Sequence, residues 1–135
     1  MRKLFTLLAA VCCMTFVTTV QAQGLADGAK IWFGTKVVDE SNKADVFSDG
    51  KVSYNTTDHT LTLNNWSKLS DTYQLVVDAS GLNEDKDFII EIVGSCKLST
   101  QSVAPFYLKK GKGDHGFVIE GKGGAKLELY VNLGK

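Results

Sequence analysis

Three acidic residues that lie close together, Glu84, Asp85 and Asp87, offer the oxygen ligands that calcium prefers. They stand between Gly81 and the apolar run that begins at Phe88, a position typical of a solvated turn. Their spacing matches no known calcium-binding loop. The sequence therefore predicts a turn at this point, with a calcium site as the alternative.

A second set of residues is suited to binding sugars, whose apolar faces stack on aromatic rings and whose hydroxyl groups meet amides and carboxylates. Asn64 and Asn65 directly precede Trp66, and Glu128 and Tyr130 share one face of an alternating segment. We predict that these five residues contact a polysaccharide. Packing of Trp66 under a loop is the alternative.

Residues for catalysis are sparse. His59 and His115 fall in expected turns and have no cysteine or second histidine at ligand spacing, so we expect both in solvent rather than on zinc. Asp39 and Glu40 are adjacent acids, but no nucleophile with its base and no phosphate-binding loop is found. We therefore expect a protein that is not an enzyme, with a polysaccharide lyase or hydrolase as an alternative.

Residues 1–22 have the pattern of a secretory signal peptide. Arg2 and Lys3 precede an apolar run over residues 4–20, and a small-residue cleavage site ends at Ala22. The run is shorter than the roughly 20 residues that a spanning helix needs. We predict export to the periplasm, the cell surface or the extracellular space, no stable membrane insertion, and one domain over residues 23–135.

Composition excludes one class of partner. The chain has 15 Lys+Arg and 15 Asp+Glu, and loss of residues 1–22 removes two of the cations, Arg2 and Lys3. Without a net positive charge, binding to nucleic acid is not expected. Of three cysteines only Cys96 remains after that cleavage, so no internal disulfide can form and we expect Cys96 to be a small buried residue.

Apolar and polar residues alternate with a period of two, as in half-buried strands. The clearest segment is 126–133, and the same alternation appears in 60–63 and 88–92. Residues 52–54 and 60–61 flank a turn-forming stretch and predict a hairpin. These patterns indicate an all-β protein.

An internal repeat organises these strands. The shift that carries Phe88 onto Phe117 aligns 88–98 with 117–127 without gaps and with six of eleven pairs identical, and the same shift places 60–69 under 89–98. Gly94, Gly123 and Gly124 then mark a corner in each copy. Together with second strands at 73–77 and 106–108, this predicts a parallel β-helix of few rungs, with residues 30–38 as an N-terminal β-hairpin cap. An antiparallel β-sandwich is the alternative.

Particular motifs strengthen this interpretation. Residues 31–38 contain Trp32 and Gly34, residues 50–65 read GKVSYN and then TLTLNN, and residues 119–127 end a rung with a glycine-rich turn. The chain resembles an opening module that recurs in secreted bacterial proteins and is similar to carbohydrate-binding domains of the pectin-lyase-like right-handed β-helix type. The resemblance implies a right-handed helix, binding of acidic polysaccharides and bound calcium, but it carries no set of ligand residues.

We therefore predict an exported, non-catalytic, polysaccharide-binding module, with calcium as the one cofactor that the resemblance suggests. The alternative is a structural or adhesion protein of the cell envelope that self-associates through its C-terminal edge strand.

Overall fold

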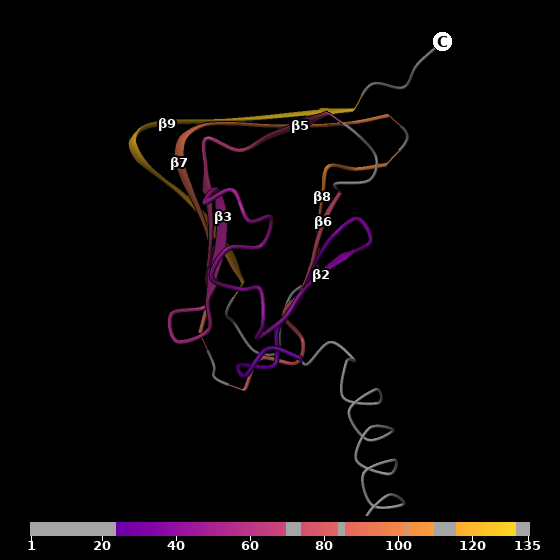
Figure 1. Cartoon of the computed structure of the whole chain (residues 1–135), viewed down its shortest axis with the longest axis vertical. Helices are drawn as coiled ribbons and strands as arrows, with labels where there is room; N and C mark the ends of the chain where they lie inside the picture. Colours follow the sequence, from indigo (N-terminus) through magenta and orange to yellow (C-terminus); the bar gives the residue numbers. More distant parts are fainter. Residues whose placement is uncertain (1–23, 70–73, 84–85, 102, 110–115, 132–135) are drawn as a thin grey trace, which may run out of the picture.

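The computed structural model describes residues 24–69, 74–83, 86–101, 103–109 and 116–131, and every regular element in these ranges is a β-strand (Figure 1). The prediction of an all-β protein is confirmed. Within the same ranges, no helix is long and apolar enough to cross a membrane. The strands are β1 (Lys30–Phe33), β2 (Lys36–Val38), β3 (Val52–Asn55), β4 (Thr60–Asn64), β5 (Ser67–Leu69), β6 (Leu75–Asp78), β7 (Phe88–Thr100), β8 (Phe106–Lys109) and β9 (Phe117–Val131).

The strands form two mixed sheets, and neither sheet closes on itself. One sheet has the order β2-β1-β6-β8, and the other has the order β3-β4-β7-β5 with β9 paired to β7. Pairing is antiparallel where short loops connect neighbours, in β1 with β2 and in β3 with β4, and also in β1 with β6. Pairing is parallel in β4 with β7, β5 with β7, β6 with β8 and β7 with β9. The pairing is thus neither all-parallel nor all-antiparallel.

Seen in Figure 1, the strands stand along three walls around a common interior. β7 and β9 run along one wall, bend, and continue along the next, while β6 and β8 stand on the third. The bends coincide with left-handed backbone at Gly94 (φ 68°), Gly123 (φ 59°) and Gly124 (φ 72°). Glycine adopts this conformation without a steric penalty, and the register of β7 and β9 shifts at the same place, between Val93 and Ser95.

The spacing of the sequence repeat equals the offset between paired residues of the parallel strands, but only up to the corner. Thr60 pairs with Ile89 and Ile89 pairs with Val118, which is the same offset that aligns Phe88 with Phe117. Beyond the corner the offset grows, because Ser67 of β5 pairs with Lys97 of β7, one residue further along than the repeat requires. Lys97 in turn pairs with Glu128 of β9, two residues further along, after a register shift between Val93 and Ser95. The ungapped alignment over 95–98 is therefore wrong.

Inward-facing rows from both sheets fill the interior. Leu61, Leu63, Ile90 and Ile92 come from the β4 and β7 wall, and all four are buried. Leu75 and Val77 of β6 are buried beside the β1–β2 hairpin, the element expected from residues 30–38. Cys96 is buried as expected. Alternation with a period of two therefore identified the buried face of these strands correctly. The expectation that 126–133 buries one face is wrong for its described part, because Leu129 and Val131 are 42% and 45% exposed.

Candidate functional site

Trp66 is buried, with 1% of its surface exposed, so the prediction that its indole faces a sugar is wrong. Its ring centroid lies 5.1 Å from that of Phe33 in an edge-on arrangement and 5.7 Å from that of Phe47 in a stacked one. Such aromatic contacts add to the free energy of burial. Trp66 is a core residue, the alternative that the sequence left open.

The corner explains this correction. If the offset of the repeat continued through the corner, Trp66 would align with the exposed Ser95. Because Ser67 pairs with Lys97, Trp66 instead lies level with the buried Cys96, and its carbonyl accepts a hydrogen bond of 2.9 Å from the Lys97 amide. A change of register by one residue moves a side chain to the opposite face of a strand.

Asn65 lies between β4 and β5, where the chain turns from one strand to the next. Its backbone is left-handed (φ 47°), and asparagine tolerates that conformation better than most residues. Its side-chain Oδ1 accepts a hydrogen bond of 3.1 Å from the Ser95 amide, and its Nδ2 donates one of 3.0 Å to Oδ1 of Asn64. Both side-chain amides thus support the turn, and their predicted contact with a ligand stays a prediction.

Tyr130 and Glu128 lie together on the outer face of β9, as expected from alternation. The Tyr130 hydroxyl donates a hydrogen bond of 3.2 Å to Glu128, and the tyrosine is 48% exposed. Glu128 also forms an ion pair with Lys126. Hydrogen bonding from Lys126 lowers the pKa of Glu128 below its ordinary value, and the same contact raises the pKa of Lys126. The pair is therefore fully charged at neutral pH.

Lys97 completes this cluster from the neighbouring strand. Its register partner in β9 is Glu128, and its ammonium lies 4.9 Å from the centroid of the Tyr130 ring. This distance is within the range of a cation–π contact. We call Lys97, Lys126, Glu128 and Tyr130 the outer-face cluster. Alternation could have identified Lys97, because it stands between the buried Cys96 and Leu98.

A second polar area lies on the outer face of the adjacent wall. It is a depression of about 270 Å³ lined mostly by hydroxyl, amide and carboxylate groups. Glu91 lies on one side of it and receives Lys122 from β9 in an ion pair of 2.8 Å, which raises the pKa of Lys122. The lining residues are Ser53, Tyr54, Asn55, Asp58, Thr60, Thr62 and Glu91.

The expected calcium ligands give no site among the described residues. Glu84 and Asp85 lie outside the described ranges, and Asp87 accepts a hydrogen bond of 2.8 Å from the Gly116 amide. Within the described part of the chain, no group of three or more acidic, histidine or cysteine side chains is placed to hold a metal ion. The calcium site stays a prediction for 84–87.

Sequence reasoning missed a buried polar cluster of Asp27, Tyr54 and His59. The expectation that His59 lies in solvent is wrong, because its side chain is buried and Nδ1 lies 2.7 Å from Oδ2 of Asp27. The Tyr54 hydroxyl donates to the same oxygen. Burial, followed by the hydrogen bond to Asp27, raises the pKa of Tyr54 far above its ordinary value. His115 lies outside the described residues.

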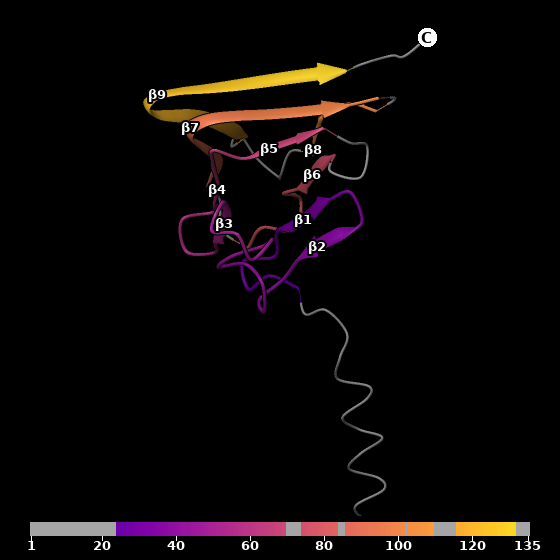
Figure 2. The same cartoon turned by 45° about the horizontal axis from the view of Figure 1, so that its top comes forward.

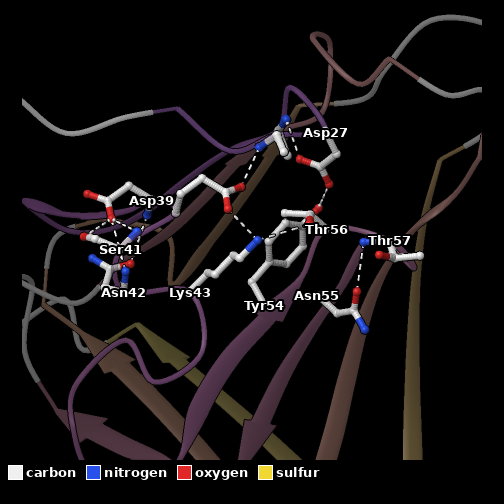
Figure 3. A network of polar contacts seen from close by, with 12 residues as sticks. Asp27, Asp39, Ser41, Asn42, Lys43, Tyr54, Asn55, Thr56 and Thr57 are labelled. Carbon is white, nitrogen blue, oxygen red and sulfur yellow. Dashed lines mark hydrogen bonds and ion pairs between the residues drawn. The ribbon is translucent and has the colours of Figure 1, made fainter.

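Figure 3 shows that the loop after β2 lies next to Asp27 and Tyr54. Asp39 accepts hydrogen bonds from the Ser41 amide (2.8 Å) and hydroxyl (2.5 Å), and the hydroxyl contact is the main cause of its lowered pKa. Glu40 accepts a hydrogen bond of 2.7 Å from the Ala26 amide and pairs with Lys43 at 2.5 Å. These two adjacent acids therefore organise a loop.

Comparisons of the chain with models of protein families, with curated proteins and with solved structures find no match. A function for this chain therefore has to be inferred from its own residues and their geometry.

Proposed function

We propose that this protein is an exported module that binds acidic polysaccharide through the outer-face cluster. The observation that carries the proposal is the half-exposed ring of Tyr130, held between the charged groups of Lys97 and Glu128. An exposed ring stacks on the apolar face of a sugar, and carboxylates accept hydrogen bonds from its hydroxyl groups. Lys97 and Lys126 supply positive charge for the carboxylates of uronate sugars.

The state of Glu128 supports binding without cleavage. A carboxyl group that acts as a general acid on a glycosidic bond needs a raised pKa, so that it still holds a proton near neutral pH. The pKa of Glu128 is lowered by Lys126, so Glu128 is ionised and serves as a hydrogen-bond acceptor. We therefore propose a binding role for this cluster.

The proposal includes a fold and a location. We infer that the strands are rungs of a short right-handed β-helix, supported by parallel pairing at a nearly constant offset on three walls. Residues 1–22 are proposed to direct export, supported by their basic start and apolar run. The flat outer walls of such a rung stack would offer an extended surface for a polymeric ligand.

A glycan array tests the function. We expect the purified protein to bind uronate-containing oligosaccharides both with calcium and with chelator, and to lose binding as salt screens the exposed lysines. If chelator abolishes binding, the site is calcium-dependent and residues 84–87 become its first candidates. No binding to any acidic glycan would overturn the proposal.

A further inference from the structure

Among the described strands, β9 lies at an end of its sheet and has one unpaired edge. It is 15 residues long, and among the described strands it pairs only with β7, which leaves its other edge open to a further strand. Figure 2 shows β9 as the outermost strand, at the end of the molecule away from β1 and β2. Backbone N–H and C=O groups on an open edge are ready to pair with another chain.

The inner row of β9 is apolar and uncovered. Ile119 is 49% exposed, whereas its register partner in β7, Ile90, is completely buried. In the same way Leu129 is 42% exposed and its partner Leu98 is 1% exposed. One more strand laid along β9 would remove this apolar surface from water, which is favourable.

The charges of β9 indicate which strand fits. Glu120 and Lys122 precede the corner at Gly123, and Lys126 and Glu128 follow it, all on the outer face. A second copy laid parallel and in register would place each charge against its like, which is unfavourable. A copy turned about a two-fold axis at Gly123 would run antiparallel and would place Glu120 opposite Lys126 of the partner subunit.

This antiparallel register satisfies the apolar row as well. It places Ile119 opposite Leu127 of the partner subunit and Phe117 opposite Leu129 of the partner subunit. The two-fold axis produces each of these contacts twice, as in any interface between identical surfaces. It also brings the two corners together at Gly123, so that each bent strand follows the bend of the other.

We propose that a second copy of this chain pairs antiparallel along β9, in the register that sets Glu120 against Lys126 of the partner subunit. The two copies would then share one continuous sheet through β7 and β9. The outer-face clusters would remain on the outside of the dimer, because edge pairing leaves the faces of a sheet free. The interface shares Lys126 with the outer-face cluster, but its test measures association of the protein alone and needs no glycan.

Sedimentation equilibrium of the purified protein tests the interface. We expect a mass of two chains that falls toward one chain on dilution. Glu120→Lys places two like-charged pairs in the interface and is expected to weaken association about tenfold. The double variant Glu120→Lys with Lys126→Glu restores opposite charges and should recover most of the affinity. Asp49→Lys, an exposed acid in the loop before β3, is the matched control and should not change association.

Hydrogen exchange gives a second measurement that needs no variant. We expect the amides of 117–131 to exchange more slowly at high than at low protein concentration, while those of β1 and β2 do not change. A single-chain mass at every concentration would overturn the proposal, and so would exchange in β9 that is independent of concentration. Failure of the double variant to recover association would show that this register is wrong.

Discussion

The carboxylate of Asp27 lies 2.7 Å from the Nδ1 atom of His59, although 32 residues separate the two in the chain. The same Oδ2 atom accepts a hydrogen bond from the Tyr54 hydroxyl, and Oδ1 accepts one of 3.0 Å from the Ala29 amide. One buried carboxylate thus joins the segment before β1 to the β3–β4 hairpin. Buried polar groups that lose their partner cost considerable free energy.

We expect Asp27→Ala to lower the free energy of unfolding by about 3 kcal/mol, because it leaves a buried hydroxyl, a ring nitrogen and an amide without this acceptor. Urea unfolding followed by circular dichroism measures the change. Lys51→Ala, at an exposed position, is the control and should change stability by less than about 0.5 kcal/mol. A loss below about 1 kcal/mol for Asp27→Ala would show that the cluster contributes little.

Tyr54 gives the protein a stability that depends on alkaline pH. Its pKa is raised in the folded state, so above pH about 10 the unfolded chain loses this proton while the folded chain keeps it. Stability is therefore complete below pH about 10 and declines as the pH rises further, by at most about 1.4 kcal/mol per pH unit. Absorbance of tyrosinate should show one tyrosine that resists ionisation in the folded protein, and this resistant step should be missing in Tyr54→Phe. Early ionisation of all tyrosines in the folded protein would contradict this prediction.

Two glycine substitutions separate backbone strain from steric overlap. A Cβ atom at Gly94 would overlap the side-chain amide of Asn65, whereas one at Gly124 meets nothing within 4 Å. Both residues have positive φ. We expect Gly124→Ala to cost about 1 kcal/mol of stability and Gly94→Ala about 2 kcal/mol or more. Equal costs in urea unfolding would mean that the Asn65 side chain moves aside freely.

Trp66→Ala is expected to destabilise the fold by about 3 to 5 kcal/mol, because it empties a site packed against Phe33 and Phe47. Calorimetric melting measures the loss. The matched control is Tyr107→Ala, which removes an aromatic ring that is 59% exposed and should leave the melting temperature nearly unchanged. Normal stability together with weaker glycan binding would return Trp66 to the list of ligand contacts.

Tyr130→Leu tests the outer-face cluster directly. The change keeps an apolar side chain in β9 but removes the ring and its hydroxyl, so we expect about tenfold weaker binding to the glycan chosen by the array. Titration calorimetry gives the affinity, and urea unfolding should show little change. Tyr107→Leu on β8 is the control and should bind normally. Unchanged affinity of Tyr130→Leu would remove this ring from the site.

Much of the wall structure could be predicted because it depends on local alternation. Leu61 and Leu63 alternate with polar threonines, and Ile90 and Ile92 repeat that pattern in the next copy, so both the strands and their parallel register follow from spacing. The same alternation placed Tyr130 and Glu128 on one outer face. In an alternating strand, one of two sets of side chains faces inward, and burial of apolar area selects which set it is.

Tertiary structure decided how many residues the corner contains and which polar groups pair at the N-terminal end. Between Asn64 and Ser67 the chain has one residue fewer than β7 has between the matching positions Val93 and Lys97, and this difference turned Trp66 into the core. His59 is buried because Asp27, from a distant segment, supplies its partner. The sequence by itself determined the strands, their facing and the register before the corner, since these depend on neighbouring residues. Corner lengths and long-range polar partners depend on how the walls meet in space, so only the folded chain determined them.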